Sequence, residues 1–252
     1  MAISIKSARE IELMREAGRI LGTVLRDVSK EVKEGMSTYR VNQIADEMIR
    51  SFGCIPSFLN YQGFPGSVCV SVNEQVVHGI PDKKKIIQDG DIVSIDAGVI
   101  YKGYQSDACR TVMVGNVSDD VRRLVETTEQ SFYEGIKYAK DGCRLHEISN
   151  AIAKYNEDRG YGVIRDLVGH GIGTELHEEP QIPNFTQESR GVKLKAGMTL
   201  AIEPMVAMGG DWHVDFMPDG WNCLTRDRSM AAHYENTVLV TMDGPEILSL
   251  VE

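Results

Sequence analysis

Several familiar features are missing from this sequence. It has no apolar run near the roughly 20 residues that a membrane-spanning helix requires, and its first ten residues lack the apolar core of a secretory signal peptide. It has no Cys-x-x-Cys pair, and its cysteines are odd in number and scattered. This pattern is typical of reduced thiols in a cytoplasm and argues against a disulfide framework or a thiolate zinc site. The five cysteines are Cys54, Cys69, Cys109, Cys143 and Cys223.

An excess of positive charge is also missing, because 27 lysines and arginines face 37 aspartates and glutamates, for a formal net charge of −10. A general nucleic-acid binder normally carries a basic face, so no specific nucleic-acid partner is expected. The basic run at residues 83–85 is predicted to be a solvated turn, although it offers a local patch for contact with a ribosome. A composition of 42% hydrophobic and 25% charged residues is typical of a folded globular protein.

Two stretches of the chain match each other at a constant offset of 107 residues (142 − 35). The matches hold without gaps over about seventy residues, which is the signature of an internal structural repeat. We predict two related halves, about 1–115 and 116–252, within a single domain that covers residues 1–252. The aligned pairs include Gly35 with Gly142, Gly53 with Gly160, Gly90 with Gly197, Ile95 with Ile202, and Asp96 with Glu203.

Each half begins with two helical patterns and continues with strand patterns. Apolar residues recur at helical spacing, and Gly35 and Gly142 are predicted to end the first helix of each half. The order of elements predicts an α+β fold in which two helix pairs cover a central antiparallel or mixed sheet. Helices are expected at residues 7–32, 38–52, 118–140 and 145–159, and strands at 67–72, 92–96, 108–114, 163–168, 199–203 and 237–241.

Four acidic residues lie at the ends or starts of apolar strand patterns. Asp96 and Glu203 each end an apolar run, whereas Asp107 and Glu235 each precede one. Burying a carboxylate is costly unless a cation meets it, and no lysine or arginine lies beside all four. If the four acids converge, two divalent cations would neutralise them. Spacing alone leaves a second interpretation open, in which they are separate capping and turn residues.

A histidine among three glycines favours the metal interpretation. His170 lies in the run Gly-His-Gly-Ile-Gly at 169–173, where glycines permit close backbone approach. A phosphate-binding loop is not expected, because prolines follow and no Gly-Lys-Ser/Thr occurs. The segment that starts at His177 is not His-Glu-x-x-His, so a helical zincin site is excluded. For a single histidine in a strand, an ordinary buried position is the simpler alternative.

Taken in chain order, the motifs resemble those of the bacterial type I methionine aminopeptidases. The resemblance implies the pseudo-twofold pita-bread (creatinase/aminopeptidase) fold, which agrees with the internal repeat. It implies a cytoplasmic, monomeric metalloprotease that hydrolytically removes the initiator methionine from nascent polypeptides whose second residue is small. The motifs are Val-Cys-Val-Ser-Val-Asn-Glu at 68–74, Val-His-Gly-Ile-Pro at 77–81, Gly-Asp-Ile-Val-Ser-Ile-Asp at 90–96, Ser-Asp at 106–107, Gly-His-Gly-Ile-Gly at 169–173, His-Glu-Glu-Pro at 177–180, Ala-Ile-Glu-Pro-Met at 201–205 and Glu-Asn-Thr at 235–237.

The resemblance also implies a role for individual residues. Asp107 and Glu235 would bridge two divalent metal ions, drawn from cobalt, manganese and iron(II), with zinc and nickel as further options. Asp96 would complete one ion, and His170 and Glu203 the other. Glu203 would also move a proton, His177 would donate to the developing oxyanion, and His78 would contact the substrate amide. The methionine pocket would consist of Phe58, Tyr61, Phe64, Cys69, Leu176 and Trp221.

The sequence departs from the family pattern at a few positions. Asn236 follows the bridging glutamate where the family usually has histidine, and Phe64 and Leu176 leave the width of the pocket open. A hairpin is expected around residues 209–215, with its aromatic residues at the solvent edge. The histidines expected to lie outside the chemistry are His146 and His233, and the solvent-edge pair is Trp212 and His213.

Two alternative functions remain open at this point. One is an Xaa-Pro dipeptidase-like pita-bread hydrolase, although such relatives usually carry an additional N-terminal domain. The other is a metal-free pita-bread binding module, which would have lost the metal ligands, whereas all five are present here.

Overall fold

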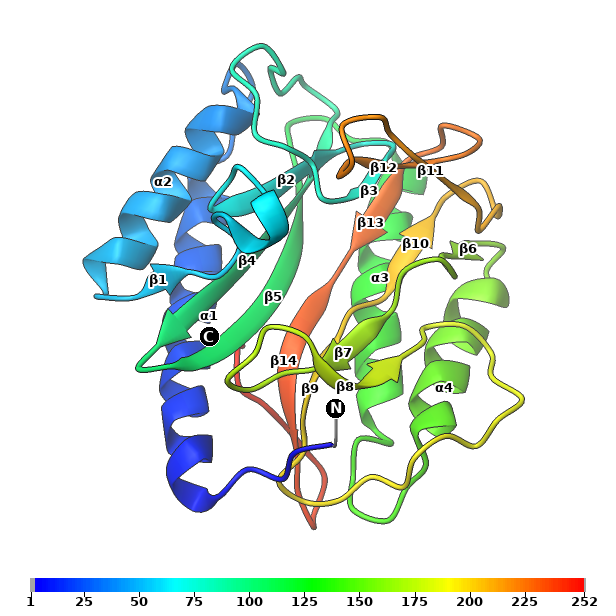
Figure 1. The fold of residues 1–252 in the computed structure, drawn as a ribbon. Coiled ribbons are helices and arrows are strands. Elements are labelled where there is room, and N and C mark those ends of the chain that lie inside the picture. The colour runs from blue at the N-terminus through cyan, green and yellow to red at the C-terminus, as the bar shows by residue number, and fades with distance from the viewer. Residues whose placement is uncertain (1–2, 252) are drawn as a thin grey trace.

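Two pairs of helices lie behind one large sheet in the computed structural model, which describes residues 3–251 (Figure 1). The first pair packs on strands from the first half of the chain, and the second pair packs on strands from the second half. This arrangement confirms the predicted α+β fold with two helix pairs. The helices are α1 (Ala8–Glu31), α2 (Thr38–Ser51), α3 (Asp119–Ile136) and α4 (Leu145–Glu157).

Within residues 3–251 the large sheet has nine strands, and all of its pairings are antiparallel. In spatial order its main path is β1 (Ile55–Pro56), β4 (Ile92–Tyr101), β5 (Tyr104–Met113), β14 (Glu235–Val240), β9 (Thr199–Ile202), β7 (Gly169–Gly171) and β8 (Glu178–Ile182). Two further strands join it at β4 and β14, namely β2 (Val68–Val72) and β15 (Pro245–Ile247). Two three-stranded sheets have the orders β13 (Ala231–His233), β10 (Met205–Ala207), β6 (Gly162–Val163) and β11 (Val214–Phe216), β12 (Cys223–Thr225), β3 (Gln75–Val77).

Serine side chains fix the starts of three helices. The Ser7 hydroxyl accepts a hydrogen bond from the Glu10 amide, and the Glu10 carboxylate accepts one from the Ser7 amide, which forms a capping box on α1. Ser37 and Ser118 cap α2 and α3 through their hydroxyls. The first amides of a helix have no partner within the helix, so these serines determine where the helices begin.

Two of the strands predicted in the first half, at 92–96 and 108–114, were too short. Strands β4 and β5 form one long hairpin that continues to Tyr101 and resumes at Tyr104. The two residues of the turn, Lys102 and Gly103, have φ angles of 49° and 86°, the left-handed backbone that tight hairpins require. Asp96 and Asp107 therefore lie inside long strands. The prediction that they lie at strand boundaries was wrong.

Several other predicted ends of helices and strands were also wrong. Helix α3 ends at Ile136 instead of reaching residue 140, and the strand predicted at 163–168 is only the two-residue β6. Gly35 and Gly142 do not end the first helices either, since each lies in the turn that leads into the second helix, with φ angles of 83° and 90°. Glycine adopts this left-handed conformation without steric cost.

The turns before α2 and α4 are built alike. The Gly35 amide donates to the Ile87 carbonyl at 2.9 Å, and the Gly142 amide donates to the Leu194 carbonyl at 3.0 Å. The two donors are 107 residues apart (142 − 35), and so are the two acceptors (194 − 87). The same backbone conformation and the same hydrogen bond thus recur at the spacing found in the sequence.

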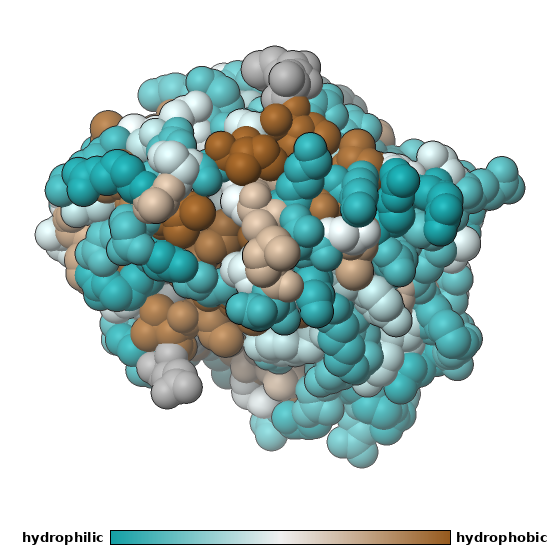
Figure 2. All heavy atoms as spheres, turned by 90° about the horizontal axis from the view of Figure 1, so that it is seen from below, coloured by the Kyte–Doolittle hydropathy of each residue, from teal (hydrophilic) through white to brown (hydrophobic). Residues whose placement is uncertain are grey.

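The surface is mainly hydrophilic on the face that Figure 2 shows, where hydrophobic residues gather in small groups among charged and polar ones. Single exposed hydrophobic residues are normal for folded proteins. Among the helices described for residues 3–251, none is both long and apolar enough to cross a membrane.

A buried ion pair attaches the segment before α1 to strand β8. Lys6 Nζ lies 2.6 Å from Glu178 Oε2, with side-chain exposures of 5% and 12%, and the Ser4 hydroxyl donates to the same oxygen. Burial raises the pKa of Glu178, but the hydrogen bonds from Lys6 and Ser4 lower it by a larger amount. The net result is a pKa below the usual value. The carboxylate therefore stabilises the fold above the pKa of the unfolded chain, and this contribution is lost as the pH falls through the folded pKa.

Replacing Lys6 by methionine is expected to lower the free energy of unfolding by about 3 kcal/mol at pH 6, because the largely buried Glu178 carboxylate loses its cationic partner. Urea unfolding at pH 6 and pH 3 measures this loss. The loss is expected to shrink at pH 3, because that pH lies below the usual pKa of a glutamate in the unfolded chain and part of the stability from the ionised carboxylate is lost there. The matched control is Lys154→Met, which breaks an exposed ion pair with Asp158 and is expected to cost less than about 1 kcal/mol. An equal loss at both pH values would contradict the interpretation.

Candidate metal centre

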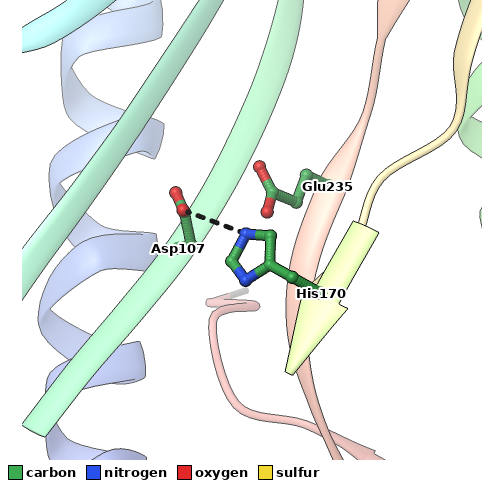
Figure 3. Close-up of side chains that lie close together, drawn as sticks. All are labelled: Asp107, His170 and Glu235. Carbon is green, nitrogen blue, oxygen red and sulfur yellow. Dashed lines mark ion pairs between the residues drawn. The ribbon is translucent and has the colours of Figure 1, made fainter. Parts of the chain in front are cut away.

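Strands from both halves of the chain bring the five predicted metal ligands together. Asp96 lies on β4, Asp107 on β5, His170 on β7 and Glu235 on β14, while Glu203 directly follows β9. Figure 3 shows Asp107, His170 and Glu235 pointing toward one another from three strands. His170 Nε2 lies 3.9 Å from Asp107 Oδ2 and 3.7 Å from Glu203 Oε1. The acids are therefore not separate capping and turn residues.

The four carboxyl groups are shielded from solvent. Burial raises the pKa of Asp96 to about 7, and it raises the pKa of Glu203 well above the usual value, with Asp96 adding repulsion. Burial and the neighbouring carboxylates raise the pKa values of Asp107 and Glu235 in the same way. Within residues 3–251, no lysine or arginine forms an ion pair with any of the four. Among the residues that the structure describes, Arg110 lowers the pKa of Glu235 slightly through its charge, but the burial and repulsion that raise this pKa outweigh it.

The donor atoms fit divalent metal ions. Asp96 Oδ1, Asp107 Oδ1 and Glu235 Oε1 are buried and have no hydrogen-bond partner. Buried polar atoms without partners are rare and call for an explanation such as an ion. Carboxylate oxygens together with imidazole nitrogen suit manganese, iron, cobalt and zinc. The set can hold a divalent cation, in agreement with the charge argument.

The ring of His170 is oriented by the backbone of the next residue. Its Nδ1 lies 2.8 Å from the Gly171 carbonyl oxygen. A carbonyl can only accept, so Nδ1 carries the proton and the lone pair of Nε2 faces Asp107 and Glu203. Burial and the nearby His177 ring lower the pKa of His170 to about 3, which keeps the ring neutral. A neutral, oriented imidazole of this kind is a typical metal ligand.

The glycines on either side of His170 allow three strands to approach closely. A Cβ atom on Gly169 would lie 2.4 Å from the Ala201 carbonyl oxygen of β9, and one on Gly171 would lie 2.2 Å from the Glu179 carbonyl oxygen of β8. Contacts this short are not tolerated with backbone atoms. The predicted reason for the glycine-rich run, close backbone approach, agrees with this geometry.

A pocket of about 190 Å³ opens beside the five ligands. It is lined by every residue that the resemblance assigned to substrate contact, so the structure places all of them in one site. Phe64 packs edge-on against Trp221, with ring centroids 5.1 Å apart. The lining residues beyond the ligands are Phe58, Tyr61, Gln62, Phe64, Cys69, His78, Leu176, His177 and Trp221.

Two histidines lie at the pocket without belonging to the five ligands. The Tyr61 hydroxyl lies 2.8 Å from His177 Nδ1, and the partial burial of His177 lowers its pKa, so the ring is neutral. His78 has a φ angle of 58°, a left-handed conformation that a non-glycine residue adopts only at a cost. Such strained residues cluster at functional sites, and here the strained residue lines the pocket.

Two residues of the site were missed in the sequence. Gln62 lines the pocket from a short turn and carried no sequence signal. His233, which was expected to lie outside the chemistry, lies 3.6 Å from Glu203 Oε2 and 3.9 Å from Glu235 Oε2 through its Nε2. A signal for it existed, because it precedes Glu235 by two residues, and residues two apart in an extended chain share a face.

Asn236 faces away from the metal centre. Its Oδ1 accepts hydrogen bonds from Arg110 Nη2 at 2.7 Å and from the Ser249 hydroxyl at 2.9 Å. Arg110 also donates to the Glu235 carbonyl oxygen at 2.7 Å. Arg110 thereby joins β5 to β14 behind the acids that these two strands carry.

The hairpin predicted near residues 209–215 begins slightly later in the chain. Strands β11 and β12 form it, and Trp221 lies on the connection between them. Trp212 and His213 stack on each other 3.7 Å apart, are partly exposed, and do not line the pocket. His146 lies on α4, outside the pocket.

The chain is similar to known metallopeptidases along nearly all of its length. The model of metallopeptidase family M24 matches residues 12–242. A methionine aminopeptidase of Clostridium acetobutylicum is 48% identical over 99% of this chain and 100% of its own length. Methionine aminopeptidase 1 of Bacillus subtilis is 47% identical, with the same coverage.

Solved structures give the same picture. The methionine aminopeptidase of Thermotoga maritima superposes with a TM-score of 0.96 at 44% identity, over 99% of this chain and 100% of that one. The Xaa-Pro dipeptidase of Bacillus anthracis is less similar, with a TM-score of 0.78 and 26% identity, and this chain covers 62% of it.

Proposed function

This chain belongs to metallopeptidase family M24 and, within it, to the methionine aminopeptidases, and we propose from this membership and its site that it removes the initiator methionine from nascent polypeptides whose second residue is small. The observation that carries the proposal is that the five candidate metal ligands line the same pocket as a group of apolar and aromatic side chains. The ligands supply hydrolytic chemistry, and the pocket is suited to one apolar side chain. An Xaa-Pro dipeptidase or a binding module is not favoured by the same relatives.

The metal centre is proposed to hold two divalent ions. Asp107 and Glu235 would bridge them, Asp96 would complete one, and His170 and Glu203 the other. Two doubly charged ions balance the four carboxylates. Imidazole among carboxylates favours manganese, iron(II) or cobalt, with zinc or nickel as further candidates. Bound ions of this kind supply Lewis-acid activation of water and carbonyl groups.

Glu203 is proposed to hold and move the proton of the reaction. It is the ligand with both oxygens near a histidine, 3.7 Å from His170 and 3.6 Å from His233. A carboxylate positioned beside the reacting groups can accept a proton and return it. The carboxylate would pass this proton toward the amine of the leaving peptide.

His177 is proposed to donate a hydrogen bond to the oxygen of the scissile carbonyl as negative charge develops on it. If the Tyr61 hydroxyl donates to Nδ1, the proton of the neutral ring lies on Nε2, which is then free to donate to substrate. An oriented donor in a partly desolvated site is strongest where charge develops. His78 would contact the amide of the second residue from its place in the pocket.

The methionine side chain is proposed to occupy the space bounded by Phe58, Phe64, Leu176 and Trp221, with Tyr61 and Cys69 at its edge. Aromatic and apolar groups make favourable contacts with a thioether. Burial and the acids nearby raise the pKa of Cys69 well above its usual value, so the thiol is a neutral lining group and not a nucleophile.

Methionine release from Met-Ala-Ser tests the proposal, with Leu-Ala-Ser and Ala-Pro as comparison substrates. The protein is stripped with EDTA and assayed before and after addition of Mn(II) or Co(II), while circular dichroism checks that the stripped chain stays folded. We expect metal-dependent release from the methionine peptide only. Cleavage of Ala-Pro would instead identify a dipeptidase, and no cleavage by a folded, metal-loaded chain would identify a binding module.

The cellular setting belongs to the same proposal. All five cysteines are free thiols, which supports action in the reducing cytoplasm. There the enzyme would act as a monomer on the N-termini of nascent chains, close to the ribosome.

A further inference from the structure

The imidazole of His233 is buried in the metal centre without any partner. The residue is 1% exposed, and neither Nδ1 nor Nε2 has a hydrogen bond. Strand β13 ends at this residue, and the chain then enters β14 with Glu235 as its first residue. A polar ring in this position would normally be hydrogen-bonded, so its two unsatisfied nitrogens need an explanation.

The distances around His233 are too long for hydrogen bonds. Its Nε2 lies 3.6 Å from Glu203 Oε2 and 3.9 Å from Glu235 Oε2, whereas a hydrogen bond from nitrogen to oxygen spans about 2.7–3.2 Å. The ring is therefore aimed at two carboxylates that it does not contact directly.

The same distances suit a shared metal ion. Transition-metal bonds to imidazole nitrogen and carboxylate oxygen are about 2.0–2.2 Å, so one ion can join donor atoms up to about 4.2 Å apart. Both separations from His233 lie below this limit, as do the 3.9 Å and 3.7 Å separations around His170. Glu203, His233 and Glu235 form one group of converging donor atoms, and Asp107, His170 and Glu235 form another.

We propose that His233 is a further protein ligand of the metal centre, which together with Glu203 and Glu235 holds a divalent transition-metal ion. The inference rests on the metal centre of the proposed function and adds a second imidazole to its five ligands. Glu203 then lies between two histidines, with one oxygen toward each. Glu235 belongs to both groups of donor atoms.

A second imidazole changes which ions the centre prefers. Oxygen ligands suit magnesium and manganese, whereas imidazole suits zinc, copper, iron and nickel. A second histidine among the carboxylates is therefore expected to increase the affinity of the centre most for the later transition metals, cobalt included. The gain from His233 is expected to be larger for Co(II) than for Mn(II).

Metal binding by the EDTA-stripped full-length protein tests the proposal without substrate. Co(II) and Mn(II) affinities are measured by calorimetry and by competition with a coloured chelator for the wild type, His233→Gln and His146→Gln. Glutamine keeps a polar side chain of similar length but removes the imidazole. We expect His233→Gln to weaken Co(II) binding by at least about 10-fold, a scale seen when even the partners of metal ligands are lost. Mn(II) binding is expected to fall less, and His146→Gln, with a histidine outside the centre, is expected to match the wild type.

X-ray absorption at the cobalt edge gives an independent measurement on the wild type itself. Imidazole rings produce a recognisable scattering pattern, and we expect two histidines per loaded centre, reduced to one in His233→Gln. A single histidine in the wild type, or an unchanged Co(II) affinity in a folded His233→Gln, would overturn the proposal. If the loaded wild type releases no methionine while His233→Gln still loses Co(II), the proposed function fails and this inference stands.

Discussion

Replacing Glu203 by glutamine is expected to lower kcat for methionine release by about 10²- to 10⁴-fold, the range over which a positioned acid–base group contributes. Glutamine has the same shape and keeps one oxygen near the His170 ring, but it cannot take up and return a proton. The two histidines that face the oxygens of Glu203 place this carboxylate where a proton can be taken up and returned. Because Glu203 also binds metal in the proposal, metal content must be measured alongside the rate.

Steady-state kinetics at matched metal occupancy measures this effect. Glu188→Gln is the control, since this glutamate is exposed and lies outside the pocket, and its kinetics are expected to match the wild type. The loss in Glu203→Gln is expected in kcat and in kcat/KM alike, because the proton is needed only during reaction. A folded, metal-loaded variant with near wild-type kcat would show that the residue is misassigned.

Replacing His177 by alanine is expected to lower kcat by about 10²- to 10³-fold, the usual effect of removing one donor to a developing oxyanion. The pocket for the methionine side chain is formed by other residues, so KM is expected to change little. Metal binding is also expected to stay at the wild-type level, because His177 is not among the proposed ligands.

Tyr61→Phe separates the donor from the group that orients it. This variant keeps the His177 ring but removes the 2.8 Å hydrogen bond to Nδ1, a loss expected to lower kcat only about 3- to 10-fold. If Tyr61→Phe costs as much as His177→Ala, the tyrosine and not the histidine is the group that acts on substrate. If His177→Ala instead raises KM with kcat unchanged, the histidine contributes uniform binding.

Through its resemblance to known enzymes, the sequence named five candidate metal ligands that the structure brings together, but it underestimated the length of two strands that carry them. The paired acids Asp96 and Asp107 were placed at strand boundaries, although the turn signal Lys102-Gly103 lies between them. The structure pairs Asp96 with Cys109 and Asp107 with Gly98, so the two acids are diagonal neighbours on one face of a hairpin. A hairpin extended through that turn would have placed both carboxylates together from sequence alone.

Other parts of the site could not be derived from local pattern. The pocket joins Tyr61 from a short turn, Leu176 from the connection after β7, and Trp221 from the β11–β12 connection. These segments meet through long-range packing, and only the resemblance to known enzymes grouped them in advance. His233 was expected to lie outside the chemistry, although it precedes Glu235 by two residues and so shares its face of the extended chain.

The arrangement of the ligands along the chain has a consequence for how the protein folds. The acids proposed to bridge the ions, Asp107 and Glu235, are 128 residues apart (235 − 107), and they meet only where β5 and β14 pair, over two residues of each strand. Long-range pairings of this kind are slow to form, because the entropy of closing a long loop is lost before the contact can stabilise the chain. In a zinc finger, by contrast, the ion binds neighbouring ligands and drives folding itself. In this protein the donor atoms converge only after the two halves have docked, so the proposed metal ions would bind only after the chain has folded.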